Sequence, residues 1–423
     1  MKAESLRRII PLLLLGGSIP GICSAETIQV KPGADVIQAA LAAAQSGDLL
    51  LLAPGTYTNT KALNINKPVT VASAYLTSRD DADRDAVVIK GPAALEEWLE
   101  LSAQPTAAGP ARLVGVWVQG NGLHSANITS TWAEILHCKF TGGKDQVSLT
   151  RGGGRVAYCH IEGAGDDNID CDNTRSWMID HNTLVRAHED GIEVRLHPDD
   201  VAPRTHVFCY NVVAGSGQSG IQLINYAGDS RREFFIHHNV FKDCRGAGVS
   251  CMHDEQSQEN YQGSGMEERA TIYNNTFDGC NAGITLAPRL IILNNIFSHL
   301  TKCAVVRGNF VTAGADQPVL DHCLFFGNTA DYSAGQIPGS RHVIDKDPLY
   351  LDRVNYALQA SSPCVDAGTA AYSRAGEKLF SMAPSEYAGG APDLGASEYG
   401  SDMPVTGRKL PREFTIGPFT VRP

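Results

Sequence analysis

The chain has 423 residues, of which 43% are hydrophobic and 19% are charged, and its formal net charge is −11. An acidic protein of this kind is not expected to bind nucleic acid electrostatically, and it repels a polyanionic polysaccharide unless a bound cation or a local basic patch intervenes. A length of about 400 residues usually means two or three domains, but this rule fails for repeat architectures, which grow along one axis.

The first 25 residues have the three regions of a secretory signal peptide. Lys2, Arg7 and Arg8 give a positive start, the apolar run 9–19 is too short to stay in a bilayer, and small residues at 24–25 suit cleavage. With Glu4, this segment carries a net charge of +2, so its removal from −11 leaves the mature chain near −13. Because no later stretch is long and apolar enough for a membrane helix, we expect a soluble protein that is secreted or periplasmic.

The N-terminal part of the mature chain is predicted to cap a larger core. An amphipathic helix over 35–45 begins with Asp35, a residue type that favours helix starts. The apolar strand 49–52 and the turn 53–57 follow it. The predicted organisation is a single β-helix domain over 26–400, with a cap at about 26–60, repeated coils at about 61–345, a C-terminal module at about 346–400 that forms the other end, and a tail at 401–423.

An asparagine recurs in five short segments that share one pattern: a β-rich run, the asparagine, a variable residue and a large apolar residue. These asparagines are Asn182, Asn211, Asn239, Asn275 and Asn295, and the steps between them are 29, 28, 36 and 20 residues. Spacings of this size indicate a solenoid with constant rungs and loops of different length. Inward Asn amides on successive rungs can hydrogen-bond to one another, which satisfies their buried polar groups.

Cysteines continue the same pattern. Cys138, Cys159 and Cys323 stand at the asparagine position of their own rungs, and Cys171 and Cys251 stand in a second inward column. Ten cysteines remain after the signal peptide, an even number that would allow disulfides in an exported protein. Their positions in the rungs instead favour free core thiols, and no C-x-x-C pair suggests a zinc site.

A second strand of each rung aligns as well. In four rungs a glycine precedes it, where we expect a tight turn, at Gly191, Gly220, Gly248 and Gly283. Alternation along the strand predicts two outward columns. They read Ser148, Asp170, Glu193, Gln222, Ser250, Thr285 and Thr150, Asp172, Arg195, Ile224, Met252, Ala287. Asp145, Asp167 and Asp190 form a third column at the turn before the strand.

Both ends of the mature chain resemble known sequences. The segments 37–41, 47–48 and 53–57 are similar to the first coil of bacterial β-helix proteins of the pectate-lyase superfamily. The segments 362–369 and 392–399 resemble the C-terminal module of exported β-helix repeat proteins. The resemblance implies an all-β fold, a right-handed single-stranded parallel β-helix with a short N-terminal capping helix. It is less specific for the reaction, because this fold hosts lyases, hydrolases, epimerases, esterases and adhesins.

Acidic side chains crowd three successive rungs. Carboxylates about 5 Å apart repel one another, so such a cluster needs a cation or raised pKa values. We expect Asp167, Asp170, Asp190 and Glu193 to bind Ca²⁺, which prefers oxygen ligands. In pectate-lyase-like enzymes Ca²⁺ bridges the uronate carboxylate and an Arg or Lys removes the C5 proton, and Arg195 is similar in position to such a base.

The surrounding carboxylates oppose the loss of a proton from Arg195, so His197 is the next candidate for the base, with Lys144 and His253 after it. The resulting hypothesis is a Ca²⁺-assisted lyase of an acidic polysaccharide.

Three other functions stay open. Asp166 and Asp167 follow Gly165 as in the G-D-D motif of polygalacturonase-type hydrolases, although the flanking residues differ from that family's motifs. Asp145 lies one coil earlier and His188 one coil later, roughly where that family keeps an Asp and a His, and Asp167 and Asp190 are candidate catalytic residues. A C5-epimerase would share the proton abstraction of a lyase. The last alternative is a protein that only binds glycans or surfaces, with a structural ion at the acidic cluster.

The predicted binding face follows from loop lengths. The longest insertions, at 196–205, 225–233 and 252–269, follow rungs on the same edge as the acidic cluster, and insertions on one face of a solenoid build its binding face. Arginines there can pair with sugar carboxylates, and tyrosines can stack on sugar rings. The candidate substrate-binding residues are Lys144, Tyr226, Arg231, Arg232 and His253. The sequence gives no basis for an oligomeric state.

Overall fold

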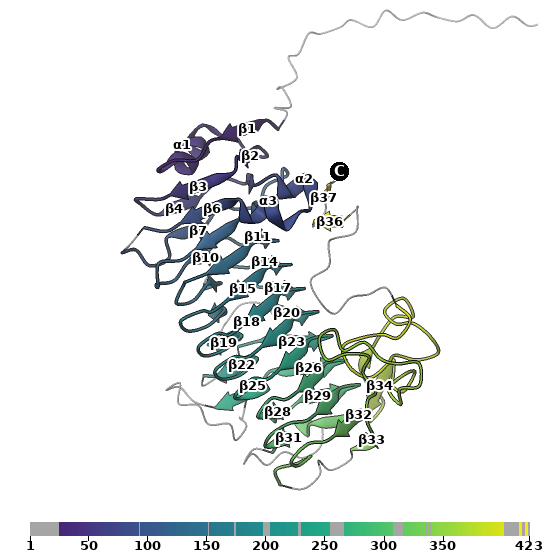
Figure 1. Cartoon of the computed structure of the whole chain (residues 1–423). Coiled ribbons are helices and arrows are strands. Elements are labelled where there is room, and N and C mark those ends of the chain that lie inside the picture. The colour runs from purple at the N-terminus through teal and green to yellow at the C-terminus, as the bar shows by residue number, and fades with distance from the viewer. Residues whose placement is uncertain are drawn as a thin grey trace, which may run out of the picture.

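Short strands of alternating apolar residues stack in parallel along one axis, and the chain is a right-handed parallel β-helix, as predicted (Figure 1). The computed structural model describes residues 25–92, 94–150, 152–172, 175–197, 204–226, 230–253, 266–307, 316–334, 337, 340–401, 414–416 and 419–421. The predicted signal peptide lies outside these residues except for Ala25. No helix among the described residues is long and apolar enough to cross a bilayer.

Three ladders of strands run along the solenoid, and we call them the first, second and third ladder in the order in which the chain visits them. The first ladder comprises β1 Thr27–Val30, β2 Leu49–Leu52, β5 Thr70–Ala72, β8 Ala111–Val114, β11 Ala133–Leu136, β14 Gly154–Ala157, β17 Trp177–Asp180, β20 Arg204–Cys209, β23 Arg232–His237, β26 Arg269–Tyr273, β29 Leu290–Leu293 and β32 Val319–Phe326. The second comprises β3 Gly55–Thr58, β6 Val87–Lys90, β9 Trp117–Gln119, β12 Lys139–Thr141, β15 His160–Glu162, β18 Thr183–Val185, β21 Val212–Ala214, β24 Val240–Lys242, β27 Thr276–Asp278 and β30 Ile296–Ser298.

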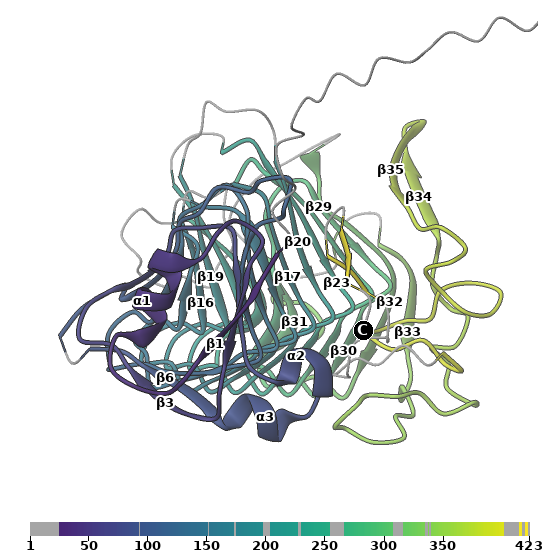
Figure 2. The same cartoon turned by 90° about the horizontal axis from the view of Figure 1, so that it is seen from above.

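The third ladder carries the predicted site. It comprises β4 Leu63–Ile65, β7 Leu99–Leu101, β10 Ala126–Ile128, β13 Val147–Ser148, β16 Ile169–Asp172, β19 Ile192–Leu196, β22 Ile221–Asn225, β25 Ala247–His253, β28 Ala282–Thr285 and β31 Cys303–Val306. β32 is long enough to pair in both the first and the second ladder, and β33, Arg341–Asp345, pairs along β32. Figure 2 looks along the stacked rungs and shows how the ladders enclose one core.

The predicted capping helix is α1, Val36–Ala43, which buries Ile37 and Leu41 against the first rung. The expectation that Asp35 caps this helix is wrong. Its backbone is left-handed, with φ 53°, and its carboxylate accepts hydrogen bonds from Thr60 instead of from the helix. Two shorter helices, α2 Tyr75–Ser78 and α3 Asp81–Asp85, lie outside the stacked rungs (Figure 2).

The predicted asparagine ladder is confirmed. Asn182 Nδ2 donates to Asn211 Oδ1, and the same bond repeats between each ladder asparagine and the next, always at 3.0 Å. The same oxygen also accepts the backbone N–H of the preceding asparagine. The ten described cysteines are all buried and none forms a disulfide.

The glycines before the third ladder serve a purpose other than the predicted turn. None of Gly191, Gly220, Gly248 and Gly283 has a positive φ. A Cβ at Gly220 would lie 2.5 Å from Phe241 Cδ1, the next two rungs repeat this crowding with the rings of Phe277 and Phe297, and at Gly191 the crowding atom is Val213 Cγ1. These rings stack with centroids about 5 Å apart. Glycine is therefore required because a side chain of the second ladder packs against the backbone at the corner before the third ladder.

The C-terminal module does not extend the stack but lies along its side (Figure 1). Asn274 Nδ2 donates to the Asp393 carbonyl at 2.7 Å, and the Gly395 N–H donates to the Asn294 carbonyl at 2.8 Å. A hairpin of β34 Ala371–Arg374 and β35 Glu377–Ser381 packs against the first ladder, where the rings of Phe380 and Tyr273 lie 4.8 Å apart between centroids. In the tail the structure describes a short antiparallel pair, β36 Phe414–Ile416 and β37 Phe419–Val421.

Candidate functional site

The register of the third ladder brings the predicted acidic residues into contact. Asp170 pairs with Glu193 and Asp172 with Arg195 across β16 and β19, and Ser148 and Gln222 continue the first of these columns. The alignment of the two predicted columns is therefore confirmed over these rungs. The expectation that they are open to solvent is wrong for the first column, because Asp170 is 7% exposed and Glu193 is 4% exposed.

Arg195 explains how these carboxylates can be buried together. Its guanidinium forms ion pairs with Asp172 at 2.9 Å, with Asp170 at 3.5 Å and with Glu193. Burial alone would lower the pKa of Arg195, but Glu193, Asp172 and Asp170 together raise it above its ordinary value. Arg195 therefore remains a cation, and this geometry opposes the role of a base that its sequence position suggested.

The carboxylates respond to the same burial. Burial raises the pKa of Glu193 to about 7, against the attraction of Arg195. Burial also raises the pKa of Asp170 well above its ordinary value, and the charge of Asp172 adds to this effect. One cation thus faces three carboxyl groups, of which two are easily protonated, so the cluster needs fewer than three positive charges to be stable.

Asp145, Asp167 and Asp190 form a second acidic column, which we call the aspartate ladder. Asp145 Oδ1 accepts the Asp167 backbone N–H at 3.2 Å, and Asp167 Oδ1 accepts that of Asp190 at 2.8 Å. Asp190 Oδ1 then accepts the Ser219 N–H at 2.6 Å. Burial raises the pKa of Asp167 well above its ordinary value, and the charges of Asp190 and Glu193 raise it further. These carboxyl groups fasten one turn to the next.

The four predicted calcium ligands do not gather around one point. Among the residues that the structure describes, only Asp321, His322 and His342 place three metal-binding atoms within 4.8 Å of one another. Asp167 and Asp190 face the backbone of the next turn, whereas Asp170 and Glu193 face Arg195. As placed, these residues do not fit Ca²⁺, because the guanidinium takes the position of a cation.

Other predicted residues converge just beyond the ends of β19 and β22. The rings of His197 and Tyr226 lie 4.2 Å apart between centroids, and they come from successive rungs. The Arg232 guanidinium donates to the Arg195 carbonyl at 3.1 Å. Burial raises the pKa of the Tyr226 hydroxyl, while the nearby Arg195 cation acts in the opposite direction. The structure thus brings together four of the predicted residues on one edge.

An arginine-rich pocket opens on the same edge, where strands of the first ladder begin. It has a volume of about 430 Å³, and Arg231 and Arg232, two of the predicted substrate-binding residues, line it. Its lining comprises Arg204, Thr205, Arg231, Arg232, Glu233, Glu267, Glu268, Arg269 and Arg289. A second pocket of about 540 Å³ shares Arg269 and Arg289 with it. Five arginines against three glutamates make the first pocket basic in an otherwise acidic protein.

Sequence reasoning missed three of these arginines, although their spacing carries a signal. Arg204 stands seven residues before a ladder asparagine, as Arg232 does, and Arg269 and Arg289 stand six residues before theirs. Such positions begin a strand of the first ladder, and Arg204 and Arg232 pair directly in register. An arginine six or seven residues before a ladder asparagine is therefore the signal for this basic edge.

Two predicted substrate-binding residues are not shown at this pocket. Lys144 lies in the turn before β13, where the third-ladder strands begin, whereas the pocket side of the edge is where they end. Its ammonium forms an ion pair with Asp166 at 2.9 Å. This hydrogen bond raises the pKa of Lys144. The backbone of His253 pairs with Asn225 at the end of β25, but its side chain lies outside the described residues.

These features define the class of protein as a right-handed parallel β-helix with a charged edge. Among solved structures the chain is similar to pectate lyase Pel9A, with a TM-score of 0.55, 17% identity, and coverage of 90% of this chain and 98% of that one. It is also similar to the PL6 family polysaccharide lyase Pedsa3628 from Pseudopedobacter saltans, with a TM-score of 0.49, 13% identity, and coverage of 76% and 92%.

A third similar structure is the catalytic unit of a GH87 alpha-1,3-glucanase from Streptomyces thermodiastaticus, with a TM-score of 0.48, 12% identity, and coverage of 77% of this chain and 69% of that one. No family model matches the sequence. No curated protein matches it either. At such low identity the likeness to Pel9A shows a shared fold, and the reaction has to be argued from the site.

Proposed function

We propose that the protein is a polysaccharide lyase that cleaves an acidic polysaccharide at the edge formed by the ends of β19 and β22. The observation that carries this proposal is the convergence of an imidazole and a phenol, His197 and Tyr226, beside a basic pocket. β-Elimination needs a base, an acid and positive charge near the sugar carboxylate, and these groups supply all three.

The reaction can be written with these groups for a 4-linked uronate. The imidazole of His197 takes the C5 proton while arginines of the pocket hold the sugar carboxylate. The C4–O bond then breaks, a C4=C5 double bond forms, and the Tyr226 hydroxyl donates a proton to the leaving oxygen. Burial favours the protonated phenol because it raises the pKa of Tyr226, as the acid role requires.

Calcium stays a hypothesis for this protein. In pectate-lyase-like enzymes it would neutralise the sugar carboxylate, but the carboxylates that could hold it here already face Arg195 or the backbone. The proposed reaction therefore assigns charge neutralisation to the arginines of the pocket and uses no metal ion. We also propose that residues 1–25 direct export and are removed, because a polysaccharide substrate is extracellular.

Hydrolysis is the second candidate, and one observation favours it. Burial raises the pKa of Glu193 to about 7 and that of the neighbouring Asp170 well above its ordinary value, so this pair can hold a proton near neutral pH. Such a pair is what acid-assisted glycosidases require. The ion pairs of both groups with Arg195 hold them away from a substrate, which ranks this function below the lyase.

The proposal is tested by incubating the purified mature protein with a panel of uronate-containing polysaccharides. We expect ultraviolet absorbance from the C4=C5 double bond, undiminished by EDTA. His197→Gln and Tyr226→Phe should each lower kcat at least about 100-fold, while Lys144→Ala, an exposed cation away from the pocket, should not change it.

Other results of the same assay point elsewhere. Reducing ends without absorbance would support hydrolysis, and inverted C5 without chain cleavage would support an epimerase. Activity that is lost with EDTA and restored by Ca²⁺ would support the calcium hypothesis. Binding without any product would leave a glycan-binding protein, and wild-type activity in both His197→Gln and Tyr226→Phe would overturn the assigned roles.

A further inference from the structure

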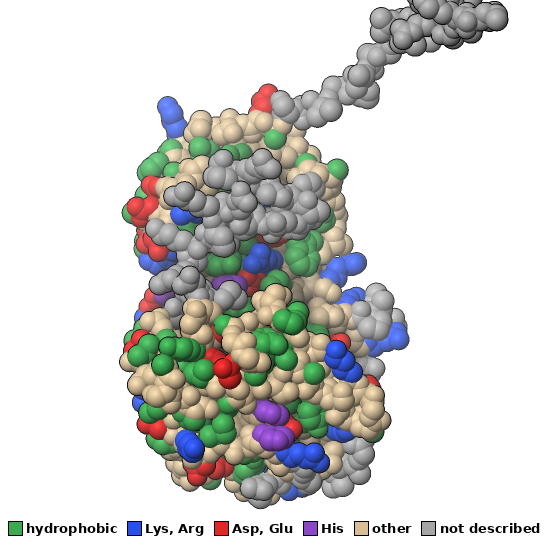
Figure 3. Space-filling model, turned by 90° about the vertical axis from the view of Figure 1, so that its right-hand side faces the viewer, with side chains coloured by type: hydrophobic (Ala, Val, Ile, Leu, Met, Phe, Trp, Pro, Cys, Tyr) green, Lys and Arg blue, Asp and Glu red, His purple; other side chains and the backbone are tan. Residues whose placement is uncertain are grey.

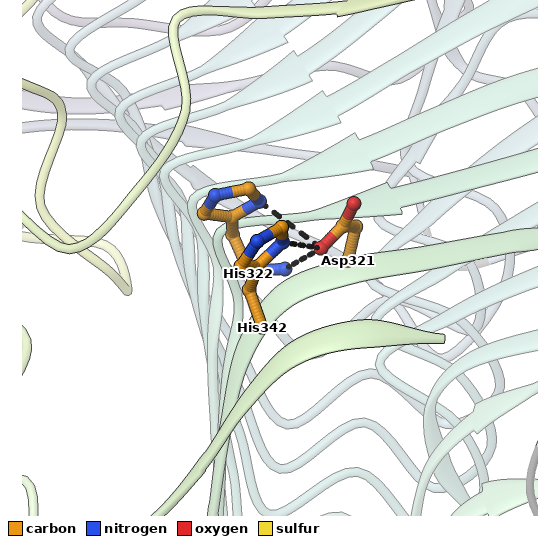
Figure 4. A group of neighbouring side chains, drawn as sticks. All are labelled: Asp321, His322 and His342. Atoms are coloured by element: carbon orange, nitrogen blue, oxygen red, sulfur yellow. Dashed lines mark hydrogen bonds and ion pairs between the residues drawn. The ribbon is translucent and has the colours of Figure 1, made fainter. Parts of the chain in front are cut away.

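A separate cluster of metal-binding side chains lies at the other end of the fold, in the last rungs. Asp321 comes from β32, His322 follows it directly, and His342 comes from β33 (Figure 4). Both imidazole Nδ1 atoms face the same carboxylate oxygen, at 3.1 Å for His322 and 2.8 Å for His342. Figure 3 shows histidine side chains next to acidic and basic ones on the lower part of the face that it draws.

The backbone holds these side chains together. Asp321 pairs in register with Arg341, so that His322 and His342 occupy equivalent positions one rung apart. Both have left-handed backbones, with φ 46° and 48°, which turn their side chains out of the sheet at the same corner. Their rings therefore stack, with centroids 4.3 Å apart.

Among the described residues, three other buried aspartates contact a histidine: Asp145 pairs with the single histidine His124, and the two others also bind an arginine. Asp180 contacts His181, and Arg155 donates to both of its carboxylate oxygens. Asp278 contacts His299, and Arg353 and a tyrosine bind its other oxygen. In both cases arginine supplies the positive charge.

Within the described part of the chain, Asp321 forms ion pairs with histidines alone. In addition, the Nδ1 atom of His322 is buried without a well-aligned hydrogen bond. A buried carboxylate without an arginine and a buried nitrogen without a proton partner both call for a cation.

We infer that Asp321, His322 and His342 bind a divalent transition-metal ion, with Zn²⁺ as the best match. Imidazole nitrogen and carboxylate oxygen suit zinc, whereas calcium prefers oxygen ligands alone. Ligand atoms about 2 Å from one tetrahedral ion lie about 3.3 Å apart, so the carboxylate oxygen needs to move away from each imidazole nitrogen by only a few tenths of an ångström. His342 is 63% exposed, which leaves the fourth position open to water or to a ligand.

The ion would fasten the end of the solenoid. β33 is an edge strand with mostly exposed side chains, and its pairing with β32 is the part of the stack that neighbouring rungs protect least. A ligand from each strand makes the metal a cross-link between them. This inference does not depend on the proposed lyase function, because the cluster lies in other rungs and at another corner.

Titration of the untagged mature protein with Zn²⁺ in a calorimeter tests the inference. We expect one saturable ion per chain, a rise in Tm with bound Zn²⁺, and no competition from excess Ca²⁺. Co²⁺ in place of zinc should give the visible absorption of a tetrahedral site. His342→Ala and His322→Gln should each weaken binding at least about tenfold.

The matched control is His299→Ala, which removes a histidine from a buried carboxylate that already has its arginine. Its Zn²⁺ affinity should equal that of the wild type. Because His342 is exposed, its alanine variant is expected to fold, and unchanged circular dichroism would establish this. Absence of saturable Zn²⁺ binding to the wild type, or equal affinity in the His342→Ala and His322→Gln variants, would overturn the inference.

Discussion

The asparagine ladder and the aspartate ladder solve the same problem with different chemistry. In both, a side-chain oxygen on one rung accepts a backbone N–H from a neighbouring rung, at 3.0 Å or less for the asparagines and 2.6–3.2 Å for the aspartates. An asparagine amide also donates to the next oxygen, so that its column is neutral and its hydrogen bonds are complete. A carboxylate cannot donate, so its column accumulates like charges.

The asparagine ladder therefore stabilises the fold, whereas the charge of the aspartate ladder lowers the free energy of unfolding. Burial and neighbouring charge raise the pKa of Asp167, which means that its ionised form is unfavourable in the folded protein. The same unfavourable charge continues into Asp170 and Glu193, where Arg195 compensates for it. Unfavourable charge concentrated on one edge of a stable scaffold is typical of functional sites.

The largest effect is expected from turning one ladder into the other. In Asn239→Asp, the new carboxylate would face the Phe208 carbonyl and the Asn275 amide oxygen, which now accept hydrogen bonds at 2.9 and 3.0 Å. We expect the free energy of unfolding in urea to fall by about 4 kcal/mol at neutral pH and by less in acid, where the carboxyl group can donate. Gln29→Glu, the same change from amide to carboxylate at an exposed position, should change it by no more than about 0.5 kcal/mol. A loss below about 1 kcal/mol at Asn239 would mean that the asparagine ladder contributes little.

Removal of Arg195 should have the next largest effect. Arg195→Met leaves Asp170, Asp172 and Glu193 without their common cation, and we expect a loss of about 3 kcal/mol at neutral pH, measured by urea unfolding. Ca²⁺ should raise the Tm of this variant but not that of the wild type, because three carboxylates then face an open position. A Tm rise in the wild type that disappears in Asp170→Asn would instead show that the predicted calcium site forms beside Arg195.

Asp167→Asn should stabilise the protein. Asparagine keeps an oxygen for the Asp190 N–H and removes a buried charge. An acid with a raised folded-state pKa binds more protons when folded, so the stability of the wild type falls as the pH rises from about 4 through that pKa. We therefore expect a gain of about 2 kcal/mol at pH 7 that fades towards pH 4. A loss of stability at pH 7 would show that the charge itself is used, as by a bound cation.

The ladders differ in how far sequence could predict them. The asparagine ladder follows from residue type and period alone, because an amide satisfies its own copy one rung away. The register of Asp170, Glu193 and Arg195 was predictable for the same reason, but the closure of the guanidinium over the carboxylates depends on side-chain direction and burial, which the period does not contain. His322 and His342 were not predicted because neither stands at the asparagine position, which Cys323 and Val343 occupy in these rungs, although their separation of 20 residues equals one ladder step.

The smallest effect, and the most specific for the edge, is expected from Glu193→Gln. Burial raises the pKa of Glu193 from its ordinary value of 4.5 to about 7. The contribution of this group to the free energy of unfolding is therefore complete below pH 4.5 and is lost as the pH rises to about 7. Glutamine does not titrate, so the variant should gain about 1 kcal/mol relative to the wild type across that window. The gain is small because glutamine also loses attraction to Arg195. Urea unfolding at a series of pH values measures this difference, with Glu377→Gln at an exposed position as the control. A difference that does not change with pH would show that Glu193 is ionised throughout this range. Arg195 would then fully offset the free-energy cost of burying its charge.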